Sequence, residues 1–317
     1  MMEISKRYFT KNKIPRIMNV QGGKFMKERK IDLHIHTIYS DGEYTPEEVF
    51  AKVKEKGLEV FSITDHDTIE GAKKMTSKEG ILYIPGVELT AKCPIGREHI
   101  LGYNLDLKNT TLNQVLNAKK QSDRDNFLLY YQTLQKKYGI TFPKEEIDFI
   151  LNRVGNVGRV DLSNLIRKYG YASTQEDAFQ KYLNPINEAV RFSKKGLTEE
   201  ECIRLLKEAG GYVSLAHPIS LNPNYRKQDL KVTYQELKSR LLLMKSYGLD
   251  AIEIEHIHQD IPFREMLKEL ANELSLLESG GTDFHGEKIK PGVEIGSGYQ
   301  GNVAIKQLSL VDKIRQS

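Results

Sequence analysis

The stretch 31–45 reads IDLHIHTIYSDGEYT and contains the first side chains whose types and spacing could do chemistry. Its first six residues alternate between apolar and polar, which is the period-two pattern of a strand. One face of that strand is then apolar, and the other presents His34 and His36 about 7 Å apart. Asp41 follows five residues later. Two imidazoles at this spacing can share one ion, so the stretch predicts a metal site.

Further candidate ligands lie where the other predicted strands end or begin. The motifs are TDHD at 64–67, GVE at 86–88, EH at 98–99, AHP at 216–218 and TDFH at 282–285. Glu253 lies near the end of another predicted strand, and His256 and His258 follow that strand. All eight histidines of the chain fall at or just beyond a predicted strand. In α/β barrels the C-terminal rim of the strands is where active sites are built.

The donor types in this set point to a particular class of metal. Imidazole and carboxylate ligands without thiolates suit Zn²⁺, Mn²⁺ or Fe²⁺. A lone histidine would more often be a core or surface residue, and only the joint occurrence of these motifs predicts ligands. The predicted ligands are His34, His36, Asp41, His66, Glu88, His99, His217, Asp283 and His285. One catalytic ion needs three or four ligands, so a site for two or three ions is predicted.

The elements that must position these ligands are short strands separated by amphipathic helices. Strands are predicted at 31–35, 58–64, 81–87, 99–103, 211–216, 250–255 and 275–281. One helix should begin after Thr45 and end at Gly57, and another should run from Thr198 to Gly210. Alternating strands and helices predict an α/β fold with a mostly parallel sheet or barrel. Seven strands favour an open or distorted barrel over a regular eightfold one.

The alternation of strands and helices breaks between 106 and 196. Apolar residues there recur near 3.6-residue spacing and no strand is predicted, so we interpret the stretch as a helical cap inserted into the barrel. The predicted domains are a barrel of 31–105 plus 197–317 and a cap of 106–196. Residues 1–30 are basic but lack the apolar core of a signal peptide, and their role stays open.

The overall composition excludes several classes of protein. The formal charge of +4 is spread along the chain, which argues against bulk capture of duplex nucleic acid. Two cysteines cannot form a disulfide framework, and no apolar run approaches the roughly 18 residues of a membrane span. We therefore expect a cytoplasmic protein that does not bind membranes. Its oligomeric state stays open.

The motifs HIHTIYSDG, ITDHDT, PGVELT, AHP and GTDFHG resemble those of the PHP (polymerase and histidinol phosphatase) family of metal-dependent phosphoesterases. The cap sequences GRVDLSNLIRKYG and DAFQKYL are similar to the subgroup that acts on nucleoside 3′,5′-bisphosphates, some members of which trim short RNA from its 5′ end. The resemblance covers about 31–290. It implies a distorted seven-stranded (β/α)7 barrel, a helical insertion and three divalent ions.

The resemblance also implies a distribution of ligands over the three ions. The first ion would take His34, His36, Glu88 and Asp283; the second Glu88, His99 and His217; and the third Asp41, His66 and His285. Glu88 would then bridge two ions. The cap departs from the subgroup, because its usual Gly-Arg-Pro-His is Gly158-Arg159-Val160-Asp161 here. This departure bears on substrate preference rather than on metal binding.

A cluster of divalent ions suits hydrolysis of a phosphate ester by a metal-bound hydroxide, without a side-chain nucleophile. Asp65 and Asp67 flank His66, and we expect them to orient imidazoles, with proton transfer as the alternative. Glu253 has the same expected role.

Candidate substrate ligands lie in the cap and beyond one strand. Arg124 and Arg159 could hold phosphate oxygens through their guanidinium groups, and His256 and His258 could line the pocket. The expected substrate is a small phosphorylated molecule of nucleotide type, with short single-stranded RNA or DNA as a further partner.

Four functions remain open from the sequence. The first is a phosphatase of nucleoside 3′,5′-bisphosphates that also acts as a 5′-3′ exonuclease on short oligonucleotides. The second is a histidinol-phosphate phosphatase or other small-molecule phosphatase, which the cap sequence disfavours. More remote are a hydrolase of the amidohydrolase type and a non-catalytic binding module. A decayed site should have lost ligands, and none of the nine is missing.

Overall fold

The computed structural model describes residues 30–93, 96–190, 196–221 and 230–317. The predicted extension at 1–30 therefore lies, except for Lys30, outside the described residues. The strands are β1 (Ile31–Asp32), β2 (Val60–Phe61), β3 (Leu82–Tyr83), β4 (Gly86–Cys93), β5 (Gly96–Tyr103), β6 (Tyr212–Leu215), β7 (Ala251–Glu255), β8 (Leu277–Gly280), β9 (Val293–Glu294) and β10 (Gly298–Tyr299). The α-helices are α1 (Pro46–Glu55), α2 (Thr110–Tyr138), α3 (Lys144–Asn152), α4 (Arg159–Lys168), α5 (Gln175–Ala178), α6 (Asn187–Val190), α7 (Glu199–Glu208), α8 (Leu230–Tyr247), α9 (Ile261–Leu274) and α10 (Ser309–Ile314). Shorter turns of helix are η1 (Ala72–Lys74), η2 (Phe179–Leu183) and η4 (Pro218–Leu221).

The strands form two main sheets, with β9 and β10 as a separate antiparallel pair. The first has the order β1-β2-β3 with all strands parallel, and the second has the order β4-β5-β6-β7-β8. Isolated parallel bridges link the two sheets on both sides, between Ile35 and Phe284 and between His66 and Glu88. The predicted α/β class is confirmed. The barrel stays a prediction, because the hydrogen-bonded strands form separate sheets of three and five.

The expectation of a mostly parallel sheet fails in one region. Strands β4 and β5 form a long antiparallel hairpin, and β5 also pairs antiparallel with β6. The physical reason lies in the connection, since only residues 94–95 separate the two strands and a parallel pair needs a crossover of a dozen or more residues. The single strand predicted at 81–87 is wrong, because its first part is β3 of the first sheet and its last two residues open β4 of the second sheet, which runs on to Cys93.

Helix boundaries follow the capping signals in the sequence. In α1 the Thr45 side chain accepts from the Glu48 amide while the Glu48 carboxylate accepts from the Thr45 amide, and Pro46 occupies the first turn. Thr198 and Glu201 form the same reciprocal cap on α7. These pairs satisfy amide donors that a helix start otherwise leaves free, and both predicted helices are confirmed.

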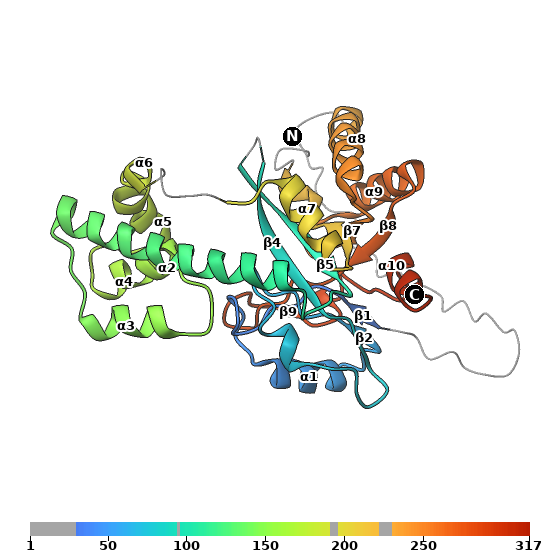
Figure 1. Cartoon of the computed structure of the whole chain (residues 1–317), viewed down its shortest axis with the longest axis horizontal. Coiled ribbons are helices and arrows are strands. Elements are labelled where there is room, and N and C mark those ends of the chain that lie inside the picture. Colours follow the sequence, from blue (N-terminus) through green and yellow to red (C-terminus); the bar gives the residue numbers. More distant parts are fainter. Residues whose placement is uncertain (1–29, 94–95, 191–195, 222–229) are drawn as a thin grey trace, which may run out of the picture.

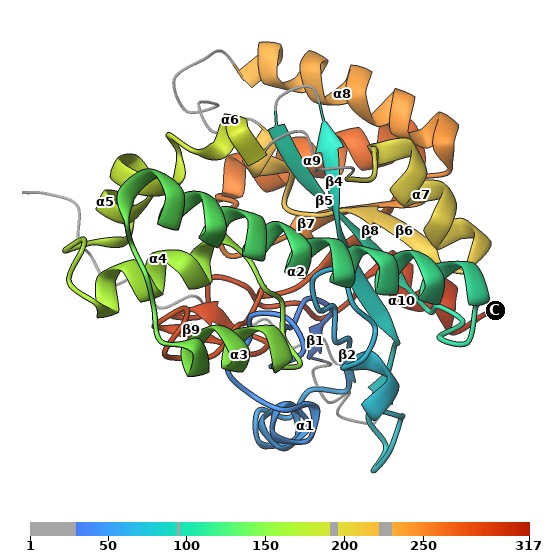
Figure 2. The ribbon, with the colours of Figure 1, turned by 60° about the vertical axis from the view of Figure 1, so that its left-hand side comes forward.

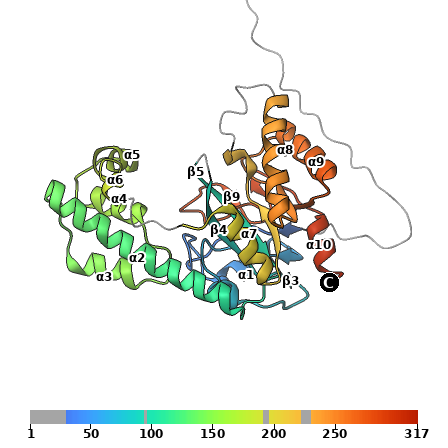
Figure 3. The same ribbon diagram turned by 45° about the horizontal axis from the view of Figure 1, so that its top comes forward.

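Between β5 and α7 the described residues form helices joined by loops, and these helices pack around their own apolar centre. Phe127, Tyr130 and Leu134 of α2 are buried against Leu162 and Ile166 of α4. Figure 1 shows α2 running from the sheets into this helical part, and Figure 2 shows it crossing in front of the strands. In Figure 3 the helical part lies on one side, and α8, α9 and α10 lie on the other. Among the described residues, no helix combines the length and apolarity that crossing a membrane requires.

Candidate metal centre

The segment after β1 delivers two histidines to the region where the two sheets meet. The predicted strand at 31–35 is shorter in the structure, with β1 at Ile31–Asp32 and a single bridge at Ile35. His34 and His36 are fully buried, and their Nε2 atoms both lie 3.2 Å from Oε2 of Glu88. The backbone amide of His36 donates to the carbonyl of Phe284, which fixes this segment beside the last motif of the chain. The predicted pair of imidazoles therefore converges on a carboxylate that lies 52 residues beyond His36 in the chain.

Glu88 is the centre of the cluster, and its two oxygens face different imidazoles. Oε2 lies near His34 and His36 and 3.0 Å from Nδ1 of His66. Oε1 lies 3.0 Å from both Nδ1 of His99 and Nε2 of His217. A carboxylate in this position can serve two ions, one on each oxygen.

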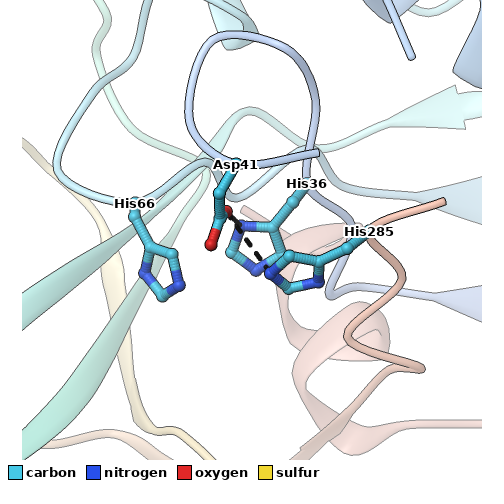
Figure 4. A group of neighbouring side chains, drawn as sticks. All are labelled: His36, Asp41, His66 and His285. Carbon is cyan, nitrogen blue, oxygen red and sulfur yellow. Dashed lines mark ion pairs between the residues drawn. The ribbon is translucent and has the colours of Figure 1, made fainter. Parts of the chain in front are cut away.

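A second group gathers around Asp41. Its Oδ1 atom lies 3.3 Å from Nε2 of His285 and 3.6 Å from Nδ1 of His36. Figure 4 shows these three side chains together with His66, all directed at one space. The donor atoms of all four lie within 4.8 Å of one another. The group contains the predicted third-ion set of Asp41, His66 and His285, with His36 added.

Asp283 closes the cluster on the side of β8. Its Oδ1 lies 3.2 Å from Nε2 of His36 and 3.6 Å from that of His34. Its Oδ2 contacts the Lys290 ammonium at 2.6 Å and Nε2 of His256 at 3.5 Å. One oxygen of Asp283 thus points at the predicted ligands, while the other is held by neighbouring side chains.

The donor set fits divalent cations. Four buried atoms at the centre lie close together but form no hydrogen bond with any described residue, namely Nε2 of His34, Nε2 of His36, Nδ1 of His66 and Oε2 of Glu88. Leaving a buried polar atom without a partner costs about 1–3 kcal/mol, and more for a charged one. A cation at their meeting point would satisfy all four at once. Neutral imidazoles with carboxylates suit Zn²⁺, Mn²⁺ and Fe²⁺, as the sequence predicts.

Proton affinities in the cluster reflect burial and opposite charges. Burial opposes ionisation of Glu88, yet the imidazoles around it hold the pKa of this carboxyl well below its usual range. Burial disfavours a charged His36, but Asp283, Glu88 and Asp41 together raise its pKa to about 9. Burial dominates at His66 and lowers its pKa to about 4. The carboxylates of the cluster therefore favour a positive charge beside them. Protons and metal ions compete for the same atoms, so a metal ion can take the place of a proton.

Glu253 orients two of the predicted ligands. Its Oε1 lies 2.8 Å from Nδ1 of His34, and its Oε2 accepts from the backbone amide of His217 at 2.6 Å. A bond at Nδ1 leaves Nε2 of His34 directed at Glu88, so the predicted orienting role of Glu253 is supported by direct contact.

Asp65 and Asp67 hold backbone segments of the site rather than imidazoles. Asp65 accepts from the Thr37 amide and from the hydroxyls of Thr37 and Ser40. The Ser40 hydroxyl lies 3.4 Å from Nδ1 of His36, so Asp65 reaches that imidazole through one intervening side chain. Asp67 accepts from the amide and hydroxyl of Thr90, which ties the loop after β2 to β4.

The backbone at the site departs from ordinary conformations at three non-glycine residues. Asp67, His217 and Asp283 have φ angles of 54°, 27° and 51°. Residues of this kind are rarely held in the left-handed region unless their surroundings require it, and such residues cluster at functional sites. Here each one belongs to a motif that the sequence singled out.

A cleft of about 820 Å³ leads from the cluster to the helical part. Asp41, His66 and His99 line one end, and Arg159 and Phe179 line the other. The guanidinium of Arg159 lies 5.3 Å from the ring centre of Phe179 and 5.9 Å from that of Tyr130. The structure thus brings Arg159 to the same cleft as the predicted metal ligands.

The other predicted substrate ligands lie elsewhere. Arg124 donates to three backbone carbonyls, those of Lys120, Leu151 and Arg153, and it does not line the cleft. These contacts give Arg124 a role in holding α2 to the end of α3. His256 is buried beside Asp283 and is adjacent to the cluster.

His258 meets His256 edge to face, with ring centres 5.4 Å apart. Sequence reasoning missed Lys290 and Arg97. The Lys290 ammonium donates hydrogen bonds to both the carboxylate and the backbone carbonyl of Asp283. Arg97 lines the cleft. Lys290 lies in a loop without periodicity, so the sequence carries no signal for it. Arg97 lies two residues before His99 on one strand, and this shared face could have indicated it.

Comparison with known proteins identifies the family. The model of the PHP domain matches residues 32–273, which is most of the chain. The chain belongs to the PHP domain family. Among its PHP relatives, the 5′-3′ exoribonuclease Rnm of Salmonella typhimurium is 30% identical over 271 residues, covering 84% of this chain and 87% of that protein.

Two further relatives extend the comparison. The 3′,5′-nucleoside bisphosphate phosphatase of Chromobacterium violaceum is 24% identical over 259 residues, covering 80% of this chain and 87% of that one. A crystal structure from Bifidobacterium adolescentis, assigned as a metal-dependent phosphoesterase, has a TM-score of 0.65 and 24% identity, and covers 92% of this chain and 96% of that one. The last likeness concerns the fold. The predicted family and the predicted enzyme class, a metal-dependent hydrolase of phosphate esters, are confirmed.

Proposed function

We propose that this PHP protein hydrolyses phosphate monoesters of small nucleotides of the nucleoside 3′,5′-bisphosphate type and also removes nucleotides from the 5′ end of short oligonucleotides. The observation that carries the proposal is the cleft that joins unpartnered, buried ligand atoms at one end to Arg159 at the other. A cation site beside an arginine suits a substrate with two anionic groups. One relative is named a 5′-3′ exoribonuclease and another a 3′,5′-nucleoside bisphosphate phosphatase, and these names support the two parts of the proposal.

We infer three divalent ions, of Mn²⁺, Zn²⁺ or Fe²⁺. Glu88 supports this inference because its two oxygens face two separate sets of imidazoles, and Asp41 supports it by gathering a third set with His66 and His285. We further propose that the sheets of three and five strands are parts of one distorted barrel, which the bridges between them support. Residues 106–196 would then be a cap that shapes the pocket, and the cytoplasmic location stays a prediction.

When bound, the ions would supply Lewis acidity to the phosphate and lower the pKa of water. The chain's own residues position the participants. Glu253 fixes the orientation of His34, and Asp65 holds the loop that carries Asp41 through Thr37 and Ser40. Arg159 lies beside two aromatic rings and can hold a phosphate remote from the ester being cleaved. Water adds to phosphorus, the bond from phosphorus to the leaving oxygen breaks, and that oxygen takes up a proton.

A phosphate-release assay tests the proposal directly. Nucleoside 3′,5′-bisphosphate, histidinol phosphate and p-nitrophenyl phosphate would be compared with and without added Mn²⁺, next to a chelator-treated sample. We expect the highest kcat/KM on the bisphosphate and loss of turnover with chelator. A preference for histidinol phosphate would overturn the substrate class, and full activity in chelator would overturn the role of the metals.

A further inference from the structure

The β4–β5 hairpin extends one face of the metal cluster outward. Thr90 pairs with His99 and Lys92 pairs with Arg97 in the register of the two strands. Side chains two positions apart on a strand share a face, and directly opposed residues do so as well. Lys92 and Arg97 therefore continue the face that carries Glu88 and His99. Lys92 lies about 7 Å beyond Thr90 along β4, and Arg97 lies about 7 Å from His99 along β5.

A cavity of about 250 Å³ lies between this hairpin, helix α2 and the start of α4. We call it the hairpin cavity. It adjoins the active-site cleft, because Thr90, Arg97, Asn156 and Arg159 line both. Four cationic side chains line the hairpin cavity, together with two carboxylates: Lys92, Arg97, Lys119 and Arg159, with Asp67 and Asp123. The cavity therefore carries a positive balance next to the site of the expected hydrolysis.

The two carboxylates of the hairpin cavity are already engaged by one lysine. Lys119 of α2 lies 3.1 Å from Oδ2 of Asp67 and 2.7 Å from Oδ2 of Asp123. The side chains of Arg97 and Arg159 form no hydrogen bond or ion pair with any residue in the described part of the chain, and the guanidinium of Arg159 faces two aromatic rings. The aromatic rings beside Arg159 position its guanidinium without neutralising it. Two guanidinium groups are thus available to an anion.

We propose that the hairpin cavity is an additional phosphate-binding subsite, in which Arg97 binds an internucleotide phosphate of a short single-stranded oligonucleotide. This rests on the proposed function. Of the two phosphates of a nucleoside bisphosphate, the one being cleaved would lie at the metal cluster and the other would bind Arg159. A longer chain has a further phosphate, and Arg97 is the cation placed to receive it. Guanidinium groups match phosphate oxygens in a bidentate manner. The substrate class that this site selects is therefore the oligonucleotide rather than the mononucleotide.

A binding experiment tests the subsite without depending on turnover. The two ligands are a 5′-phosphorylated tetraribonucleotide with phosphorothioate linkages and a nucleoside 3′,5′-bisphosphate. The affinity of each is measured by its competition with a fluorescently labelled copy of the tetraribonucleotide. We expect Arg97→Ala to weaken tetranucleotide binding roughly tenfold, as for one lost charge-assisted contact, and to leave bisphosphate binding within about twofold. Arg97→Lys should recover part of the loss. The slope of log Kd against log salt should fall by about 0.7 for the tetranucleotide.

Arg204→Ala is the matched control, because it removes the same charge from an exposed position on α7. It should change neither affinity. Equal weakening of both ligands by Arg97→Ala, or no weakening of either, would overturn the subsite, as would equal affinity of the unaltered protein for the two ligands. Hydrolysis by the unaltered, metal-loaded protein is measured in parallel. Failure to hydrolyse either unmodified substrate would contradict the proposed function instead, whatever the outcome of the binding comparison.

Discussion

At the scale of single residues, the cluster depends on carboxylates that each make two kinds of contact. Glu88 presents one oxygen to His34, His36 and His66 and the other to His99 and His217. One carboxylate oxygen of Asp283 lies near His34 and His36, and the other contacts Lys290 and His256. The loss of such a residue should therefore affect more than one neighbour.

Glu88→Gln should damage activity more than His285→Gln. A bridging carboxylate serves two ions, whereas His285 belongs to one group of ligands. We expect at least a hundredfold loss of kcat for Glu88→Gln, or roughly 2.7 kcal/mol of transition-state stabilisation. Steady-state kinetics with metal analysis of both variants checks this. Activity within a few-fold of the unaltered protein, at unchanged metal content, would rule out the bridging role.

Glu253→Gln should lower metal affinity without unfolding the protein. The amide is similar in shape to the carboxylate but is a weaker acceptor for Nδ1 of His34. Partners that orient a ligand in this way typically contribute 10–100-fold to metal affinity. Titration with Mn²⁺ measures the effect, and Glu255→Gln on the same strand is the control, because Glu255 pairs with Arg264 instead. Equal metal affinity in the two variants would show that Glu253 does not tune the site.

At the scale of elements, the loop between α3 and α4 joins the helical part to the metal-binding loops. The Asn156 side chain donates to the carbonyl of His66, and the Asn156 amide donates to the carbonyl of Ser40. Gly155 lies so close that an added Cβ would sit 2.6 Å from the Ser40 oxygen and 2.8 Å from that of Ile38. Both contacts are with backbone atoms, which cannot move aside as a side chain can.

Gly155→Ala should therefore separate this loop from the loop that carries Asp41. We expect a loss of about 1–3 kcal/mol in the free energy of unfolding, in the range of overpacking in a well-packed site. Metal content should fall with it, since Asp41 follows Ser40 directly. Denaturant unfolding and metal analysis measure the two effects, with Gly158→Ala as control because a Cβ there meets no atom within 4 Å. Equal stability of the two variants would contradict the packing argument.

Arg159→Ala should act on substrate binding. If Arg159 holds the remote phosphate in the ground state and the transition state alike, KM for a bisphosphorylated nucleotide should rise with little change in kcat. The loss should be on the order of 1.5–3 kcal/mol, and p-nitrophenyl phosphate, which has no second phosphate, should be unaffected. Parallel kinetics on both substrates with a thermal melt checks this. Equal losses on both, with a lower Tm, would assign Arg159 a purely structural role.

At the scale of the whole molecule, the metals should contribute to stability because their ligands come from both sheets. His36 follows β1 while Glu88 and His217 come from the second sheet and its extension. A ligand present at a hundred times its Kd stabilises the folded state by about 2.7 kcal/mol. Chelation should then lower Tm by roughly 5–10 °C. Calorimetry with and without chelator, followed by addition of Mn²⁺, measures it, and an unchanged Tm would mean that metal binding does not hold the sheets together.

The sequence by itself determined the local features of this protein. The period-two pattern marked the segment of His34 and His36, of which Ile31–Asp32 form β1 and Ile35 a single bridge. The capping residues Thr45 and Thr198 marked two helix starts, because these signals act between residues close in the chain. The joint motifs also identified the nine candidate ligands, since each one follows or opens a strand. The family resemblance rested on the same motifs, and the match to the PHP domain confirmed it.

Only the tertiary structure decided which of these residues meet. The antiparallel hairpin of β4 and β5 sets Lys92 opposite Arg97 and brings Glu88 between two sets of imidazoles. Packing of α2 on α3 directs Arg124 to backbone carbonyls, although its sequence context suits a phosphate ligand equally well. Lys290 reaches Asp283 through a loop without a repeating pattern. Such contacts depend on how strands far apart in the chain pair, and side-chain type and spacing carry no information about that pairing.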